Sequence, residues 1–391
     1  GIARSLAFNH WHVCALTHGG EVRCWGDGNL GRLGYGDNSN QKARFLPPVN
    51  VLTTEEKATG IFIVEVATAI NSSCAMTNTG KVRCWGSNQN GQLGYGSADI
   101  SSFGGTNNSY ADEAGEDPMD LPFVHLGGKA VALYSQASGY CALLDSGSPI
   151  CWGKGDNGRL GQGNTDHIGE TMGDDPGDYS PVNTGGTVIE MSVGYGSACA
   201  RHTNNTISCF GKGRDLARAS ATDFGADGTD DLTVASDLSD FTPVQLFRGG
   251  EHHCAVNALG DVRCWGDNTS GELGYGDTTD NSTTADLAAD GNVSVGAAVI
   301  TGATGADHTC VVTTAGTIRC WGEGDSGRLG LGNTLDIGDN DLPSNQPNVK
   351  VWRDIRIFAQ KHSSCAIKAG KARCWGCNSS GHLGYGHKET I

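Results

Sequence analysis

Cysteine is the residue type in this sequence whose number and spacing most clearly indicate a chemical role. Fourteen of the fifteen cysteines form seven close pairs: Cys14–Cys24, Cys74–Cys84, Cys141–Cys151, Cys199–Cys209, Cys254–Cys264, Cys310–Cys320 and Cys365–Cys374. Nine residues separate the two members in six pairs, and eight in the seventh. Such pairs can form disulfides, remain buried thiols or bind zinc, although structural zinc sites prefer about two to four intervening residues. We therefore expect seven disulfides and no metal.

Cys377 is left over after this pairing. It follows Trp375-Gly376 in a predicted turn, where four other copies of the motif carry Asp27, Ser87, Asp267 or Glu323. We expect an unpaired thiol that is exposed or half-buried. A bond to a partner chain is the alternative.

Other candidate chemical motifs are weaker. Gly26–Gly31, Gly153–Gly158 and Gly322–Gly327 match the Gly-x-Gly-x-x-Gly dinucleotide fingerprint, but no helix is predicted after them, so we interpret them as turn glycines. His12, His252 and His308 share one position, two residues before a first cysteine, which indicates a structural role between strands. The pair His252-His253 is a weak metal or acid–base candidate. We expect neither enzymatic activity nor a cofactor.

Two loop segments could bind ligands or partners. Asp223, Asp227, Asp230 and Asp231 have a loose spacing for Ca²⁺, as do Asp336, Asp339 and Asp341, with solvated loops as the alternative. Lys212, Arg214 and Arg218 form a basic segment in an acidic chain. We predict this segment as the contact for an acidic partner, against the alternative of a merely degenerate repeat.

Short strands must position these residues. A segment with a Cys-Ala-Leu-like run, a turn and a Val-Arg-Cys-Trp-Gly-like run recurs seven times at steps of 54 to 67 residues, and the fourth copy is degenerate, with Phe210 in place of the tryptophan. An apolar, β-branched stretch precedes each copy, and a Leu-Gly-x-Gly tail follows all copies except the fourth. Two apolar runs around a glycine turn predict a β-hairpin.

Seven such repeats of about 55 to 65 residues predict an all-β, closed seven-bladed β-propeller with one hairpin disulfide per blade. We expect a single domain over residues 1–391. The expected blades are 1–50, 51–122, 123–182, 183–242, 243–296, 297–349 and 350–391.

The repeated Ala-Leu, turn glycine, Trp-Gly and Gly-x-Leu-Gly-x-Gly pattern resembles the regulator of chromosome condensation repeat over essentially the whole chain. The resemblance implies a closed ring, but the family is functionally mixed. It includes a nuclear exchange factor for a small GTPase, a plant ultraviolet-B photoreceptor, a secreted inhibitor of β-lactamase and bacterial surface proteins with paired cysteines. The Gly-Trp-Arg-His-Thr signature of the photoreceptor is absent.

The net charge of the chain and the compartment that its cysteines indicate limit the classes of function that are compatible with the sequence. The chain has 27 basic and 43 acidic residues, a net charge of −16, which opposes binding to nucleic acid or anionic lipid. No run of apolar residues is long enough to span a membrane. Seven disulfides would persist in a secreted, surface, periplasmic or lumenal protein. The sequence begins at Gly1 without a signal-peptide pattern, so we expect a mature or trimmed chain.

These observations predict a non-enzymatic scaffold or accessory subunit that binds a partner protein through one face of the propeller. A glycan-binding or adhesive surface protein and an inhibitor of a secreted enzyme are the alternatives. Polar insertions at 97–121, 164–181, 212–242, 277–296 and 333–348 are expected on one rim. Blade seven is expected to lack an outer strand, and its hairpin to turn at Ala369-Gly370.

Overall fold

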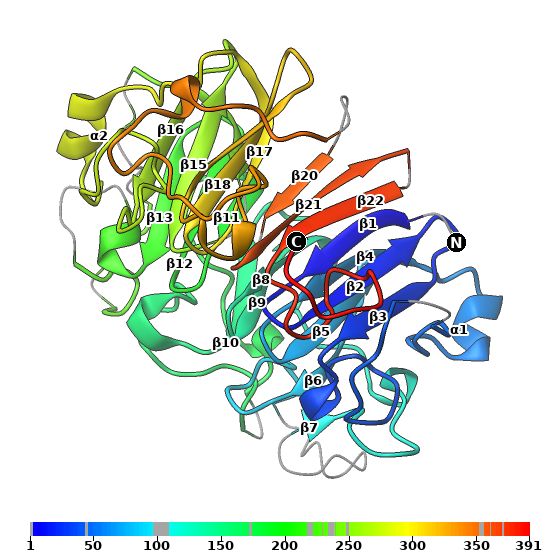
Figure 1. Ribbon diagram of the computed structural model, residues 1–391. Coiled ribbons are helices and arrows are strands. Elements are labelled where there is room, and N and C mark those ends of the chain that lie inside the picture. Colours follow the sequence, from blue (N-terminus) through cyan, green and yellow to red (C-terminus); the bar gives the residue numbers. More distant parts are fainter. Residues whose placement is uncertain are drawn as a thin grey trace. The chain divides into compact units, whose positions relative to one another are not determined.

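The computed structural model contains seven antiparallel sheets, six with three strands and one with four (Figure 1). It describes residues 3–43, 46–96, 109–171, 174–216, 222–228, 230–233, 238, 240–247, 250–351, 356–359, 361–369 and 371–391. We number the sheets as blades 1 to 7 in chain order. The fold is the all-β propeller fold that the repeats predicted, with one sheet for each repeat.

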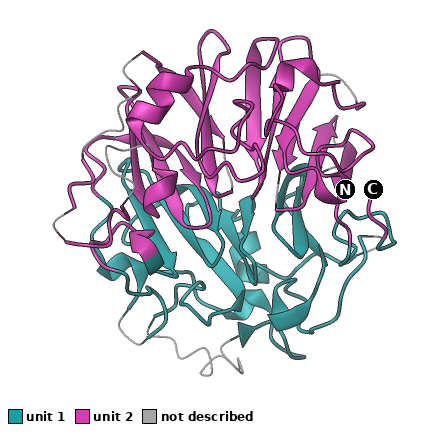
Figure 2. Ribbon diagram, turned by 60° about the vertical axis from the view of Figure 1, so that its left-hand side comes forward, with its two compact units in different colours: residues 1–156, 165–182, 379–388 teal, residues 157–164, 183–378, 389–391 magenta. Residues whose placement is uncertain are grey.

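The chain divides into two compact units (Figure 2). Unit 1 comprises residues 1–156, 165–182 and 379–388, and it holds blades 1 to 3. Its strands are β1 (Ala3–Phe8), β2 (His12–Thr17) and β3 (Val22–Gly26); β4 (Ile63–Thr68), β5 (Ser72–Thr77), β6 (Val82–Ser87) and β7 (Ser109–Tyr110); and β8 (Ala130–Gln136), β9 (Gly139–Leu144) and β10 (Pro149–Gly153).

Unit 2 comprises residues 157–164, 183–378 and 389–391, and it holds blades 4 to 7. Its strands are β11 (Val188–Val193), β12 (Ser197–His202) and β13 (Ile207–Gly211); β14 (Pro243–Phe247), β15 (His252–Asn257) and β16 (Val262–Gly266); β17 (Val299–Thr304), β18 (His308–Thr313) and β19 (Ile318–Gly322); and β20 (Arg356–Ala359), β21 (Ser363–Lys368) and β22 (Lys371–Gly376).

Helices are short wherever the structure describes the chain. The two α-helices are α1 (Thr54–Ala58) and α2 (Thr284–Asp290). Single 3₁₀ turns occur at η1 (Asn29–Gly31), η3 (Pro118–Asp120), η4 (Asp156–Gly158), η5 (Pro176–Asp178), η6 (Gly213–Asp215), η7 (Asp325–Gly327) and η8 (Pro343–Asn345). None of these described helices has the length and apolar character needed to cross a membrane.

Strand register brings the paired cysteines together. The glycine turn lies midway between the two cysteines, so that Cys14 faces Cys24 across β2 and β3, and the same register recurs in every blade. The facing Cα atoms are 4.0 to 4.1 Å apart, and the sulfur atoms 1.99 to 2.09 Å apart. All seven cysteine pairs therefore lie at disulfide distance, each within its own hairpin.

The outer edge of most blades is a single residue pair. In five blades the glycine that follows the aromatic residue of the repeated motif forms a bridge with a residue further along the chain: Gly26 with Gln41, Gly153 with Ile168, Gly211 with Phe224, Gly266 with Asn281 and Gly322 with Ile337. In blade 7, the backbone groups of Gly376 and Ile391 exchange two hydrogen bonds of 2.7 and 3.2 Å. Among the described residues blade 7 thus has no fourth strand, as expected, but this does not distinguish it, because only blade 2 has one and Ile391 provides the single pairing found in most other blades.

Candidate interaction surface

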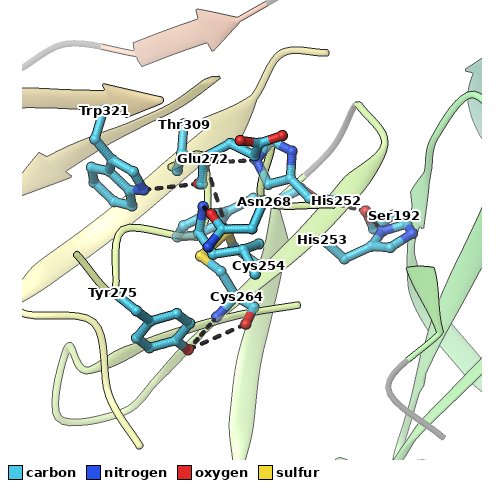
Figure 3. The surroundings of a disulfide bond; sticks show 12 residues. Ser192, His252, His253, Cys254, Cys264, Asn268, Glu272, Tyr275, Thr309 and Trp321 are labelled. Atoms are coloured by element: carbon cyan, nitrogen blue, oxygen red, sulfur yellow. Dashed lines mark hydrogen bonds between the residues drawn. A yellow bond between two sulfur atoms is a disulfide. The ribbon is translucent and has the colours of Figure 1, made fainter. Parts of the chain in front are cut away.

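Hydrogen bonds between neighbouring blades fix the frame of the surface. In three junctions a buried histidine, a hydroxyl, a backbone carbonyl and a tryptophan are linked in the same order. We call this the inter-blade relay: His12, Ser73, Arg32 carbonyl and Trp85; His252, Thr309, Glu272 carbonyl and Trp321; His308, Ser364, Arg328 carbonyl and Trp375. Figure 3 shows the second relay beside the Cys254–Cys264 pair, where the Tyr275 hydroxyl also bonds the backbone of Cys264.

The donor and acceptor of each hydrogen bond in the relay follow from the groups involved. The carbonyl accepts both the indole N–H and the hydroxyl, so the hydroxyl oxygen is free to accept from histidine Nε2, which lies 2.7 to 2.8 Å away. Burial lowers the pKa of all three histidines, that of His252 to about 4, and keeps the rings neutral. These histidines thus join adjacent blades, which is a structural role.

His252 and His253 do not form a joint site. The ring of His252 bonds Thr309 in blade 6, whereas the ring of His253 bonds Ser192 and Ser197 in blade 4. Neighbouring residues on a strand point to opposite faces, which explains the divergence. The weak metal or acid–base hypothesis for this pair is therefore not supported by its geometry.

The tail glycines receive the outer segment of the next blade. A Cβ atom on Gly31, Gly91, Gly158 or Gly271 would lie 2.2 to 2.4 Å from the backbone of that segment. Acidic side chains shape the same segments: Asp174 accepts the backbone N–H groups of Gly169 and Glu170, and Asp230 those of Gly225 and Asp227. The loops are therefore held by their own carboxylates.

The weak calcium candidates take part in this local bonding. Asp223 accepts from Asn157 and the Gly213 backbone, and Asp231 accepts from Thr233. Asp336 and Asp341 likewise accept backbone N–H groups. Among the described residues, no three of these carboxylates bring possible ligand atoms within 4.8 Å of one another, and calcium binding by the loops stays a prediction.

One backbone hydrogen bond recurs in all seven blades and joins positions of variable composition. The residue after the Trp-Gly motif, or after Phe210-Gly211 in blade 4, donates its N–H to the carbonyl of the residue directly before the second strand, at 2.7 to 3.4 Å. We call the residues so joined the variable pairs: Trp11 with Asp27, Asn71 with Ser87, Ser138 with Lys154, Gly196 with Lys212, Glu251 with Asp267, Asp307 with Glu323, and His362 with Cys377. The backbone hydrogen bond is the same in every blade, and the two residues that it joins differ from blade to blade.

Charged side chains dominate the variable pairs of blades 4 and 5. Arg214, close to Lys212, donates to Glu251 at 2.9 Å and to Asp267 at 2.8 Å. Lys212 Nζ lies 3.5 Å from Glu251. The predicted basic contact is thus already paired with carboxylates at this surface, and Arg218 lies outside the described residues. Positive charge at Lys212 and Arg214 is balanced before any partner binds.

Blades 6 and 7 bring a second charged group together. Asp307, Glu323 and His362 are the only set within the described ranges whose possible ligand atoms all lie within 4.8 Å of one another. The Arg328 guanidinium bonds both carboxylates. Burial raises the pKa of Asp307 and of Glu323. Because the Arg328 guanidinium already provides the positive charge beside the two carboxylates, this group is better suited to hydrogen bonding with polar groups of a partner than to binding a metal ion.

Trp11 was missed in the sequence, although a signal was present. Six of the eight tryptophans belong to Cys-Trp-Gly motifs, and Trp11 and Trp352 do not. Trp352 lies outside the described residues. Trp11 is 39% exposed and stacks on His10 with ring centroids 5.7 Å apart. Cys377, the cysteine outside the seven pairs, is half-buried beside the backbone of His362.

Comparisons with known proteins agree with this repeat architecture. Residues 63–92, 244–272 and 299–328 match the profile of the "Regulator of chromosome condensation (RCC1) repeat". This chain contains RCC1 repeats. The matched segments cover the second strands and the Cys-Trp-Gly motifs, and they end directly before the Leu-Gly-x-Gly tails.

Two curated relatives illustrate the range of proteins that contain such repeats. The ultraviolet-B receptor UVR8 of Arabidopsis thaliana is 28% identical over 83% of this chain and 66% of the receptor. The human E3 ubiquitin-protein ligase HERC2 is 28% identical over 69% of this chain and 5% of the ligase. This RCC1-repeat protein therefore spans less than two thirds of either relative.

Solved structures share the fold of this RCC1-repeat protein at low identity. Human WBSCR16 aligns with a TM-score of 0.68 at 17% identity, covering 92% of this chain and 84% of that one. Prp20p of Saccharomyces cerevisiae aligns with a TM-score of 0.65 at 18% identity, covering 93% and 81%. One structure shows the yeast protein bound to Kap60, and another work on it describes its binding to Gsp1p and histones.

Proposed function

We propose that this protein is a non-enzymatic scaffold or accessory subunit that binds a partner protein through the variable pairs of a closed seven-bladed ring. The observation that carries the proposal is a backbone hydrogen bond that is repeated in all seven blades and joins two positions whose residues differ from blade to blade. Repeat proteins bind through residues that their repeats do not share. The partner proteins named for the yeast structure support the same mode of action.

Ring closure belongs to the proposal and is supported by one contact inside unit 1. The indole of Trp25 in blade 1 donates to the carbonyl of His382, in the tail of the seventh repeat, at 2.9 Å. The indoles of Trp85, Trp152, Trp321 and Trp375 make the same bond to the tail of the repeat before them. The last repeat is thus followed by the first in the same way.

An oxidising compartment is the second part of the proposal. Seven cysteine pairs at disulfide distance support it, because such pairs persist as disulfides outside the reducing cytosol. An inhibitor of a secreted enzyme would be one form of the same protein-binding function.

Affinity capture from the native source, read by mass spectrometry, tests the proposal. The test variant combines Glu251→Gln with Asp267→Asn on the variable pairs. The control combines Glu21→Gln with Asp145→Asn, which remove the same charge from hairpin turns at the opposite end of the sheets. We expect the test variant to lose a partner at least tenfold while the control retains it. Equal retention by both folded variants would contradict the proposed surface.

A glycan-binding function is a second candidate because of Trp11. Its exposed ring, stacked on His10 and bonded through its backbone carbonyl to Asp27, offers an apolar face beside polar groups. This combination suits a sugar ring. Glycan-array binding that disappears in Trp11→Ala and persists in Phe62→Ala, an exposed aromatic elsewhere, would favour this candidate. Identical array profiles for both variants would exclude it.

A further inference from the structure

A buried chain of hydrogen bonds joins blade 4 to blade 5. Asp215 Oδ2 lies 3.3 Å from Ser197 Oγ, which lies 2.9 Å from His253 Nε2. His253 Nδ1 lies 2.7 Å from Ser192 Oγ, which donates to the carbonyl of Phe247 at 2.6 Å. All four side chains are fully buried. Figure 3 shows the end of the chain at which His253 faces Ser192.

Donor and acceptor capacity sets the direction of every bond in this chain. The Phe247 carbonyl can only accept, so the single hydroxyl hydrogen of Ser192 is used there. Ser192 Oγ must then accept from Nδ1–H of His253. A neutral imidazole has no hydrogen on its other nitrogen, so Nε2 must accept from the hydroxyl of Ser197.

The same argument reaches Asp215. With its hydrogen directed at His253, the Ser197 oxygen can only accept from the carboxyl group. Asp215 must therefore carry a proton when His253 is neutral. If His253 carries the proton instead, Asp215 is ionised and Ser197 donates to it. Both arrangements contain one proton in total, and its removal leaves one hydroxyl hydrogen between two acceptors.

We propose that Asp215 and His253 hold one shared proton through Ser197, so that opening of the junction between blades 4 and 5 transfers this proton from the carboxyl to the imidazole. An exposed carboxyl of aspartate is ionised above about pH 4, and an exposed imidazole is protonated below about pH 6.5. Between these values the closed and open junctions bind the same number of protons. The stability of the junction is then independent of pH over that range.

Surrounding charges favour the form with the proton on Asp215. Burial raises the pKa of Asp215 to about 7, with Glu251 and Asp267 adding to the rise and Lys212 and Arg214 opposing it. Burial lowers the pKa of His253 to about 3, and His252 lowers it further. Trp265 stacks on His253 with centroids 6.0 Å apart and contributes no charge.

The missing tail of the fourth repeat explains why this device occurs at this junction. In the inter-blade relays a tail carbonyl accepts the hydroxyl, so no proton is needed. Here η6 replaces that tail, and the carboxyl of Asp215 takes the place next to the hydroxyl. Within the described part of the chain, the indole nitrogen of Trp265 accordingly lacks the acceptor that other blades provide.

Ser192 is not a nucleophile in this arrangement. Its hydroxyl is fully buried and its hydrogen is committed to the Phe247 carbonyl. The resemblance to a serine–histidine–carboxylate triad is therefore confined to the residue types, and the chain acts on the stability of the junction.

Two substitutions each remove one of the two groups that can bind the shared proton. Asp215→Asn keeps a donor towards Ser197 but leaves only the imidazole to titrate. Hydrogen–deuterium exchange measures the protection of the backbone amides of β12 and β15, and the protection factor of the variant is divided by that of the wild-type protein at each pH. For Asp215→Asn this ratio should fall about tenfold per pH unit as the pH drops from 6.5 to 4. His253→Gln leaves only the carboxyl, and its relative protection should fall about tenfold per unit as the pH rises over the same range.

Asp145→Asn, an exposed change of equal charge, is the control and should show a constant ratio. The tautomer of His253 gives an independent readout, because the chain requires hydrogen on Nδ1, and ¹⁵N NMR of the imidazole detects it. A bare Nδ1 at pH 6, or a ratio independent of pH in Asp215→Asn, would overturn the proposal. His253→Gln adds a second slope, so a poorly folded Asp215→Asn variant would still leave a decisive measurement.

Discussion

At the scale of single residues, several buried hydroxyl and imidazole groups are hydrogen-bonded across blade junctions. The hydroxyl of Ser364 accepts from His308 and donates to the Arg328 carbonyl. Thr309 does the same in the junction before it. A hydroxyl is thus required at this position, while the extra methyl group of threonine is compatible with it.

Ser364→Ala should lower the free energy of unfolding by about 1–3 kcal/mol, because the donor of His308 loses its acceptor in a buried site. Ser364→Thr should cost much less, since Thr309 occupies the equivalent site in blade 6. Urea denaturation of the two variants measures the difference. Equal destabilisation by alanine and threonine would show that packing, rather than the hydrogen bond, matters here.

The neutral state of His308 makes its contribution dependent on pH. Burial lowers the pKa of His308 below its ordinary value, so the unfolded chain binds a proton that the folded chain does not bind. Stability must then fall as the pH drops below about 6.5. In His308→Gln the amide still donates to Ser364 but does not titrate.

We expect the stability of the wild-type protein, relative to His308→Gln, to fall by about 1.4 kcal/mol per pH unit below pH 6.5. Denaturation curves at pH 6.5, 5.5 and 4.5 measure this slope, with the exposed substitution His18→Gln as the control. A constant difference between the wild-type protein and His308→Gln would mean that His308 is protonated in the folded protein.

At the scale of elements, close backbone contacts determine how a tail meets the next blade. Gly271 and Gly332 both have positive φ, of 77° and 79°. A Cβ atom on Gly271 would lie 2.2 Å from the backbone nitrogen of Asp339, whereas one on Gly332 would meet no atom within 4 Å. Substitution of Gly332 therefore tests only the cost of a positive φ, whereas substitution of Gly271 adds the steric clash with the neighbouring backbone.

Gly332→Ala should cost about 1 kcal/mol, the penalty of a left-handed backbone for a residue with a side chain. Gly271→Ala should cost at least about 3 kcal/mol, because the outer segment of blade 6 must also move away. Thermal and urea unfolding of both variants test this order. Equal costs would mean that the tail and the outer segment separate freely.

The hairpin turn of blade 7 contains a strained residue. Lys368 pairs with Lys371, so the connection has two residues, as its spacing predicted, and Ala369 adopts φ of 48°. Gly370 lies outside the described residues. Ala369→Gly should stabilise the protein by about 0.5–1 kcal/mol, because glycine adopts this conformation without a clash.

Ala315→Gly is the matched control for this turn. Ala315 also precedes a glycine in a hairpin turn, but its φ is not positive. The control should be neutral or slightly destabilising, since glycine there only adds freedom to the unfolded chain. A stabilised Ala315→Gly variant, or an unchanged Ala369→Gly variant, would argue against strain at Ala369.

Much of this element-scale structure could be predicted from the sequence. Hairpins and cysteine register follow from local spacing, because the turn lies midway between Cys14 and Cys24. Contacts between blades were not predictable in the same way. The pairing of Arg214 with Glu251 and Asp267 depends on how one sheet packs against the next. The exposure of Trp11 and the bridge at Ile391 likewise depend on tertiary structure.

At the scale of the whole molecule, the cysteine pairs define the conditions under which the protein is stable. Each pair closes a loop of ten or eleven residues within one hairpin. A loop of this size contributes about 2–3 kcal/mol in the chain-entropy description. Because every link is local, loss of one should weaken its own blade first.

Peptide mapping without reduction should find seven links, each within one blade, and no link to Cys377. The double variant Cys310→Ala/Cys320→Ala should lose about 2–3 kcal/mol of stability, while Cys377→Ser should leave all seven linked peptides in place. Links between blades, or free thiols throughout the folded protein, would contradict the arrangement and the oxidising compartment proposed from it.

The recurring bond that joins each variable pair connects main-chain atoms only. Any residue can occupy the accepting position, and any residue except proline the donating one, without loss of that bond. Duplication and drift could therefore change what the surface recognises while the fold stays intact. The same property makes the positions of the variable pairs, apart from the buried Ser87, Gly196 and Asp267, a natural set for a combinatorial library, in which new binding specificities could be selected from one stable parent protein.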